Sequence, residues 1–225
     1  MGKKAGIPGT IQAVIFDLDG VLIDSEWLSF LEWKNLARQY GGSLDDSIFP
    51  ELVGTTAEET ASIVMRTTGV VFDVQENCAL IWRRVTERLK VKIDPLPGAS
   101  DLVYKLAQRG YPLAIASNSL SDYIENALQG LGLSAYFPVW VSRDQVAEGK
   151  PAPDAYLLAA RRLGIAPQHC LAIEDSRVGV QSATSAGMRV VAVPGKRDHL
   201  AGFEGAWRIY HSLHQFSEAL EEALG

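Results

Sequence analysis

Short runs of apolar residues, each ending at a polar side chain, recur along most of the chain. They lie at residues 11–18, 111–116, 139–142, 170–173 and 189–193. Continuous apolar runs bounded by glycine or aspartate are typical of strands in a parallel sheet that is covered on both faces. The pattern therefore predicts five buried, parallel strands.

Residues with helical periodicity fill the gaps between these runs. The predicted helices span 99–109, 121–131, 153–163 and 176–186, and a glycine follows each one closely: Gly110, Gly132, Gly164 and Gly187. Glycine is the usual residue just past the end of a helix. Strand and helix alternate every 25 to 30 residues or so, which is typical of βαβ units. We therefore predict an α/β fold with a doubly wound, Rossmann-like parallel sheet.

One long segment, between Asp24 and Asp94, contains no buried strand. It shows helical periodicity at 27–40, 57–68 and 74–91. Loops longer than about 15 residues are uncommon, so this segment should have structure of its own. We expect a helical cap domain at 24–94, inserted into a core domain formed by 1–23 and 95–225. The expected hinges are residues 20–24 and the turn sequence at 93–98.

Composition narrows the class of protein. Of the 225 residues 47% are hydrophobic, which excludes a disordered chain, and no run approaches the roughly 20 apolar residues of a membrane span. Cys78 and Cys170 are far apart and lie in no metal-binding spacing, as expected for reduced thiols in the cytoplasm. The net charge of -6 disfavours nucleic acid and anionic membranes as partners. We expect a cytoplasmic monomer.

Polar side chains gather where four of the predicted strands end. In chain order they are Asp17 and Asp19, Ser117 and Asn118, Lys150, and Glu174 with Asp175. Ligands of open α/β sheets bind at the carboxyl ends of the strands, so these groups should share one site. Crowded carboxylates repel unless a divalent cation joins them, and ligands that are all oxygen suit Mg²⁺. Each residue alone is better explained as a cap, a turn or a solvated side chain, but the ordered set indicates phosphoryl transfer.

These motifs resemble those of the haloacid dehalogenase superfamily, in its branch of phosphatases and β-phosphoglucomutases that carry a helical cap. The first motif is matched by Asp-Leu-Asp-Gly-Val-Leu at 17–22, and the second by Ser117. The third is Lys150 in a Lys-Pro-x-Pro-Asp sequence, and the fourth is Glu174-Asp175-Ser176 with Gly179. The resemblance extends from about residue 11 to residue 194.

The resemblance implies a role for each matching residue. Asp17 would be the nucleophile that forms an aspartyl phosphate, and Asp19 would be the general acid and base. Ser117 and the Asn118 amide would hold phosphoryl oxygens, and Lys150 would offset their charge. The implied Mg²⁺ site consists of Asp17, Asp19 through its main-chain carbonyl, Asp175, and Glu174 either directly or through water.

The cap segment favours hydrolysis over mutase chemistry. The resemblance to β-phosphoglucomutases would place a histidine in the first cap helix and an arginine in a cap loop, but this chain has Ser29 and Ala57 near those positions. We therefore expect a Mg²⁺-dependent phosphatase that hydrolyses small phosphorylated metabolites, with sugar phosphates as the expected class. A phosphomutase is the main alternative, and an inactive binding protein is a further one. Asp19 argues against a dehalogenase.

Two features of the cap are better explained by packing and solvation than by substrate binding. The aromatic residues Trp27, Phe30 and Trp33 are spaced as the core of a helical unit rather than as a substrate pocket. The basic run at 82–90 is expected to be a solvated helix face rather than a site that attracts phosphate.

Overall fold

The computed structural model describes residues 10–194 and 202–224, and the chain divides into two compact units. The core unit comprises residues 1–23 and 92–225, and the cap unit comprises Asp24–Val91. The cap unit therefore ends at Val91, whereas the sequence predicted that the cap domain ends at Asp94. That the two units are separate domains stays a prediction.

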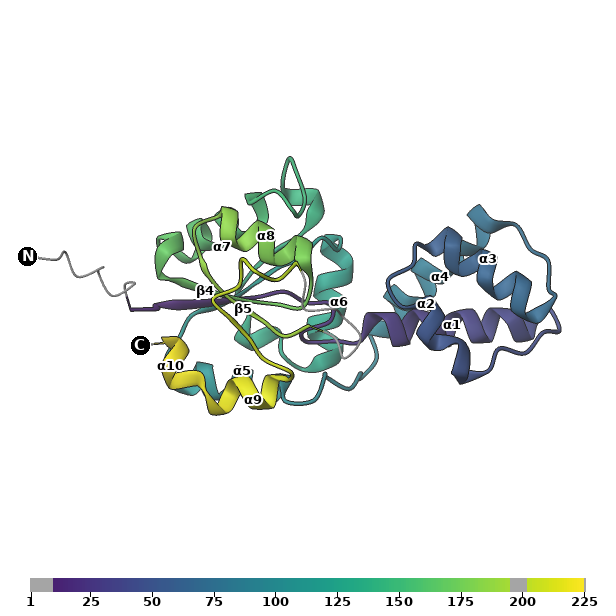
Figure 1. Cartoon of the computed structure of the whole chain (residues 1–225). Helices are drawn as coiled ribbons and strands as arrows, with labels where there is room; N and C mark the ends of the chain where they lie inside the picture. The colour runs from purple at the N-terminus through teal and green to yellow at the C-terminus, as the bar shows by residue number, and fades with distance from the viewer. Residues whose placement is uncertain (1–9, 195–201, 225) are drawn as a thin grey trace, which may run out of the picture. The chain divides into compact units, whose positions relative to one another are not determined.

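A parallel sheet forms the centre of the core unit (Figure 1). Its strands are β1 (Ala13–Phe16), β2 (Leu113–Ala116), β3 (Val139–Val141), β4 (Cys170–Glu174), β5 (Arg189–Ala192) and β6 (Arg208–Ile209). They are arranged in the order β3-β2-β1-β4-β5-β6, and every neighbouring pair is parallel. This is the doubly wound order, so the predicted fold class is confirmed. Strand β6 was not predicted from the sequence.

Helices cover both faces of this sheet (Figure 1). Those of the core unit are α5 (Ala99–Gln108), α6 (Ser121–Leu131), α7 (Asp154–Leu163), α8 (Arg177–Ser185), α9 (Leu213–Glu218) and α10 (Leu220–Leu224). Helices α7 and α8 lie on one side, with α5, α9 and α10 on the other. Alternate strand residues such as Ala13, Ala114 and Ala172 pack against α7 and α8 in one buried cluster. Because these side chains are small, the helices can approach the sheet closely.

The strand register brings the carboxyl ends of the central strands to one level. Phe16 of β1 is paired with Ile115 of β2 and with Ile173 of β4. The chain reverses its direction of winding between β1 and β4. Ligands of open α/β sheets bind at the carboxyl ends of the strands at such a point, so this is where we expect the site.

Four helices form the cap unit. They are α1 (Ser25–Gln39), α2 (Phe49–Leu52), α3 (Ala57–Thr68) and α4 (Val74–Leu89). Asp24 caps the first turn of α1, and a capping box of Thr56 and Glu59 starts α3. Phe30 and Trp33 are 1% exposed, as expected for cap core. Short 3₁₀ segments complete the described structure, at Asp46–Ile48, Ser134–Tyr136, Arg143–Gln145 and Pro167–His169.

No helix among the described residues has both the length and the apolar character needed to cross a bilayer.

Candidate active site

Hydrogen bonds that extend the sheet fix the first residues of the site. The main-chain N–H of Asp17 donates to the carbonyl of Ile173 at 2.9 Å, which continues the pairing of β1 with β4. The N–H of Ser117 likewise donates to the carbonyl of Val141 at 3.0 Å. Both side chains are buried, Asp17 at 7% and Ser117 at 2% exposure. The sheet therefore places both residues at the same edge, as the sequence predicts.

A buried lysine joins two of the carboxylates. The Nζ atom of Lys150 lies 2.7 Å from Oδ1 of Asp17 and 2.6 Å from Oε1 of Glu174. The lysine side chain is 3% exposed and that of Glu174 is fully buried. Burial lowers the pKa of Lys150, but the charges of Asp17 and Glu174 raise it further, so the net shift is upward. Lys150 is therefore a permanent cation at the end of β1 and β4.

Tyr156 of α7 supports this ion pair from beneath the site. Its hydroxyl donates to Oε1 of Glu174 at 2.6 Å, and its ring centroid lies 5.1 Å from Nζ of Lys150. Burial, followed by the charge of Glu174, raises the pKa of Tyr156 well above its ordinary value. The phenol therefore stays protonated and acts as a donor to Glu174. Oε2 of the same carboxylate accepts from the hydroxyl of Ser176 at 3.2 Å.

The loop that carries Lys150 is held by Asn118. The Asn118 Oδ1 atom accepts from the main-chain N–H of Lys150 at 2.8 Å, and its Nδ2 donates to the Lys150 carbonyl at 3.2 Å. The peptide bond between Lys150 and Pro151 is cis. Because the side-chain amide of Asn118 is engaged here, the expected contact with a phosphoryl group falls to its main-chain N–H and stays a prediction.

Three carboxylates converge beside the lysine. One oxygen from each of Asp17, Glu174 and Asp175 lies within 4.8 Å of the others. Burial and the charge of Glu174 raise the pKa of Asp17 to about 7. Burial and the charge of Asp17 raise the pKa of Asp175 to about 9. One ammonium group thus faces three carboxylates, and this excess of negative charge, carried on oxygen ligands, suits a divalent cation such as Mg²⁺.

Two glycines make room for this cluster. A Cβ atom added to Gly20 would lie 1.8 Å from Oδ2 of Asp175, and one added to Gly179 would lie 1.9 Å from Oε2 of Glu174. Gly20 also has a φ of 74°, which L side chains rarely adopt. The glycines of the first and fourth motifs therefore let the carboxylates approach the backbone.

Asp19 is held apart from this cluster. Its carboxylate is not a member of the group of three, and its two oxygens accept hydrogen bonds from the hydroxyls of Ser119 and Tyr123, at 2.8 and 2.9 Å. As a metal ligand it could then contribute its main-chain carbonyl, the contact that the resemblance implies. That contact and the other expected residue roles stay predictions.

Three residues of the site were not predicted from the sequence: Ser119, Tyr123 and Tyr156. The two tyrosines occupy inward-facing helix positions, where an aromatic ring is expected simply as core. The available signal was their hydroxyl, since a buried tyrosine usually directs its O–H to a polar partner. Ser119 directly follows Ser117 and Asn118, and only the fold shows that it faces Asp19.

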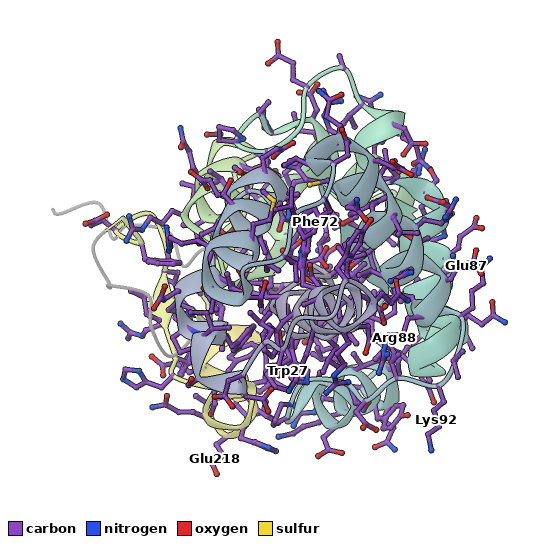
Figure 2. All side chains as sticks on the ribbon, turned by 90° about the vertical axis from the view of Figure 1, so that its right-hand side faces the viewer. Trp27, Phe72, Glu87, Arg88, Lys92 and Glu218 are labelled. Carbon is purple, nitrogen blue, oxygen red and sulfur yellow. The ribbon has the colours of Figure 1, made fainter. Side chains whose placement is uncertain are left out.

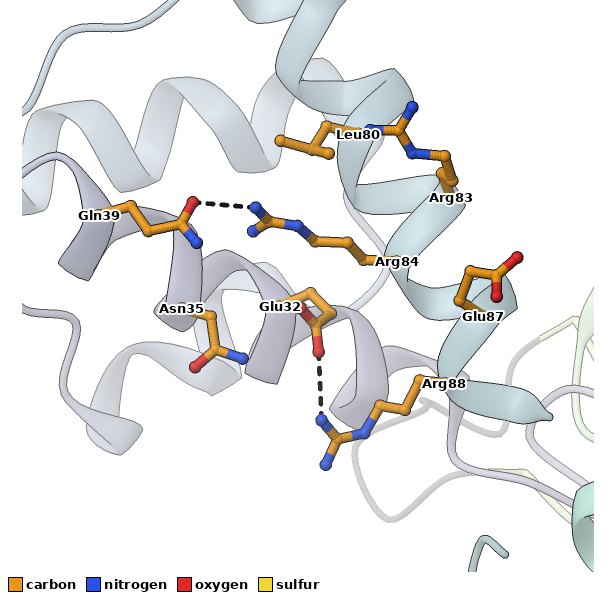
Figure 3. A pocket seen from close by; sticks show the side chains of 8 residues that line it. All are labelled: Glu32, Asn35, Gln39, Leu80, Arg83, Arg84, Glu87 and Arg88. Atoms are coloured by element: carbon orange, nitrogen blue, oxygen red, sulfur yellow. Dashed lines mark hydrogen bonds and ion pairs between the residues drawn. The ribbon is translucent and has the colours of Figure 1, made fainter. Parts of the chain in front are cut away.

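The basic run of α4 lies along a shallow groove in the cap unit (Figure 3). The groove is lined by Glu32, Asn35, Gln39, Leu80, Arg83, Arg84, Glu87 and Arg88. Arg84 donates to Gln39 at 2.9 Å, and Arg88 pairs with Glu32 at 3.1 Å. Glu87 projects outward at the edge of Figure 2 and is exposed. Two of the arginines thus bind α1, and the run is a solvated helix face that also ties α4 to α1.

Comparison with known proteins identifies the family. Residues 14–193 match the haloacid dehalogenase-like hydrolases. This chain belongs to that family. It is 32% identical over 182 residues to a phosphorylated carbohydrates phosphatase of Thermotoga maritima, covering 79% of this chain and 82% of that protein. It is 36% identical over 203 residues to a bifunctional riboflavin kinase/FMN phosphatase of Arabidopsis thaliana, covering 89% of this chain but only 53% of that protein's length.

A solved haloacid dehalogenase family hydrolase from Deinococcus radiodurans has the same fold. It superposes with a TM-score of 0.76, at 28% identity over 95% of this chain and 96% of that one. A putative β-phosphoglucomutase from Thermotoga maritima superposes with a TM-score of 0.79, also at 28% identity, over 95% of this chain and all of that one. The predicted family is therefore confirmed, as is the prediction that this haloacid dehalogenase-like protein is an enzyme of the phosphatase kind.

Removing the Tyr156 hydroxyl should destabilise the core unit. Tyr156→Phe deletes a buried hydrogen bond to a carboxylate, so we expect the free energy of unfolding to fall by about 2 kcal/mol in urea titrations. Tyr104→Phe is the matched control, because Tyr104 is exposed and should change stability by less than about 0.5 kcal/mol. Equal effects of the two substitutions would contradict the proposed support of Glu174.

Gly20→Ala should damage the carboxylate cluster specifically. The new methyl group would displace Asp175, so we expect Mg²⁺ affinity, measured by calorimetry, to fall at least about tenfold. Gly110→Ala is the matched control: its φ is 79°, but nothing lies within 4 Å of an added Cβ. Both variants should lose about 1 kcal/mol of stability from backbone strain. If Gly110→Ala weakened Mg²⁺ binding equally, strain rather than the displaced carboxylate would be responsible.

The raised carboxyl pKa values predict how stability depends on pH. Between about pH 4, where an unfolded aspartate ionises, and the folded values of about 7 for Asp17 and 9 for Asp175, the folded state binds more protons than the unfolded state. The free energy of unfolding of the metal-free protein should therefore fall as pH rises through this window. Mg²⁺ should restore stability most at the alkaline end.

Urea midpoints measured with EDTA or with Mg²⁺, at about pH 5.5 and about pH 8.5, check this expectation. A Mg²⁺ effect of the same size at both pH values would refute it.

Proposed function

We propose that this protein is a Mg²⁺-dependent phosphatase that hydrolyses phosphate monoesters of small carbohydrates through an aspartyl phosphate. The observation that carries the proposal is the position of Asp17 at the end of β1, buried beside Lys150 and within a group of carboxylates. Confirmed family membership and the names of relatives, one of which is a phosphatase of phosphorylated carbohydrates, support it.

In the first step, an oxygen of Asp17 attacks the phosphorus of the monoester. The bond from phosphorus to the alcohol oxygen breaks, and Asp19 supplies the proton that this oxygen needs to leave as an alcohol. Lys150 is already bonded to Asp17 at 2.7 Å, so its charge can stabilise the negative charge on the transferred group. Ser117 and the main-chain N–H of Asn118 would hold the phosphoryl oxygens.

In the second step, water attacks the phosphorus of the aspartyl phosphate. Asp19, now ionised, accepts a proton from this water, and the bond between phosphorus and Asp17 breaks. Inorganic phosphate leaves and both aspartates return to their starting protonation states. The alternation of Asp19 between acid and base requires that its carboxylate stay close to, but not bonded to, the reacting group.

Mg²⁺ would be held by Asp17, Asp175 and the main-chain carbonyl of Asp19. Glu174 would contribute charge from behind, because Lys150, Tyr156 and Ser176 already occupy its two oxygens. When bound, the ion would neutralise phosphoryl charge and the repulsion within the cluster. The cytoplasmic location and the monomeric state remain predictions.

Asp17→Asn tests the nucleophile. The amide is close in shape but a poor nucleophile, so we expect phosphate release from p-nitrophenyl phosphate and from a sugar phosphate to fall about 10³-fold or more. EDTA should abolish activity and Mg²⁺ should restore it. Survival of activity in the variant would exclude an aspartyl phosphate.

The same assay distinguishes the main alternative. With glucose 1-phosphate as substrate, the proposed phosphatase releases inorganic phosphate, whereas a phosphomutase yields glucose 6-phosphate. Ser29 and Ala57 lie near the positions where the mutase resemblance would place a histidine and an arginine, and their presence favours release of inorganic phosphate.

A further inference from the structure

Two hydroxyl groups hold the carboxylate of Asp19. Ser119 Oγ donates to Oδ2 at 2.8 Å, and the Tyr123 hydroxyl donates to Oδ1 at 2.9 Å. Both donors come from the segment that follows β2, about 100 residues further along the chain. Each oxygen of Asp19 therefore has a partner of its own.

Both hydroxyls are fixed by the core unit itself. The Ser119 N–H donates to Oγ of Ser117 at 3.0 Å, and the Ser119 carbonyl accepts from the N–H of Arg143 at 3.0 Å. Ser119 is thus tied to Ser117, directly after β2, and to the segment after β3. Tyr123 lies in α6 and is 2% exposed, so its ring is locked by packing.

The chemistry of these partners suits a group that changes protonation during turnover. A lysine or arginine partner would favour the ionised carboxylate alone, as Lys150 does for Asp17. A hydroxyl can donate to a carboxylate and can accept from a carboxylic acid after it rotates. Neutral hydroxyls can therefore hold Asp19 in both of the states that acid and base catalysis require.

From this geometry we propose that Ser119 and Tyr123 are positioning residues that hold Asp19 for proton transfer and keep its carboxylate out of the neighbouring acidic cluster. The inference rests on the proposed function, because it assumes that Asp19 is the general acid and base. It adds two residues to which none of the four sequence motifs assigns a role toward Asp19.

The test compares two substrates that differ in their need for an acid. A sugar phosphate has a poor alkoxide leaving group that must be protonated, whereas p-nitrophenolate leaves without help. Because the alcohol leaves in the first chemical step, kcat/KM reports substrate binding and the transfer to Asp17, and not the later hydrolysis of the aspartyl phosphate. For Ser119→Ala combined with Tyr123→Phe, we expect kcat/KM to fall about 10- to 100-fold for the sugar phosphate and less than about threefold for p-nitrophenyl phosphate.

Control variants separate positioning from structural damage. Ser119→Thr keeps the hydroxyl and should keep the ratio of the two kcat/KM values near that of the wild type. Tyr104→Phe removes an exposed hydroxyl and should change neither value. Thermal unfolding of every variant verifies folding, and if Tyr123→Phe does not fold, Ser119→Ala alone should still lower the ratio. Equal losses with both substrates, or no loss, would overturn the proposal.

Asp19→Asn separates failure of the inference from failure of the proposed function. It should lower the same ratio at least as strongly as the double variant does. A selective variant is one that lowers kcat/KM more for the sugar phosphate than for p-nitrophenyl phosphate. If Asp19→Asn is selective and the hydroxyl variants are not, the positioning role is wrong and the mechanism stands. If Asp19→Asn is not selective, or the wild type releases no phosphate, the proposed function fails and this inference fails with it.

Discussion

The buried ion pair of Lys150 with Asp17 and Glu174 is the interaction on which the arrangement of the site depends. A buried ammonium or carboxylate without a partner would cost several kcal/mol, so these groups must occur together. Asn118 holds the main chain of Lys150, and Tyr156 holds Glu174. A substitution at any of these positions would therefore disturb the charge balance around Asp17, even where it leaves that residue untouched.

The sheet order makes this pairing possible. Asp17 and Glu174 are distant in sequence, yet β1 and β4 are adjacent, and the N–H of Asp17 continues their ladder. Lys150 reaches the same edge from the loop between β3 and α7. Parallel strands deliver their carboxyl ends to one side of a sheet, so three separate loops can converge without distortion of the strands.

Much of the core unit could be predicted because its signals are local. Five apolar runs gave the five longer strands, and motifs at strand ends gave Asp17, Lys150 and Glu174. The two-residue strand β6 has no apolar run, since it is held by main-chain pairing to β5. Tyr156 and Tyr123 were missed because an inward-facing aromatic residue on a helix indicates core, and only the fold shows where its hydroxyl points.

The four carboxylates near the strand ends differ in the partners that the fold gives them. Asp17 shares a cation with Glu174, which is fully enclosed and bonded at both oxygens. Asp175 lies against Gly20 and forms no ion pair within the described residues, and its pKa is raised further than that of Asp17. The side chain of Asp19 is hydrogen-bonded, in the part of the chain that the structure describes, to neutral hydroxyls alone. Groups of one chemical type are thereby suited to nucleophilic attack, structural anchoring, metal binding and proton transfer. The different roles follow from the neighbouring groups, because the three aspartates among these carboxylates have the same intrinsic acidity.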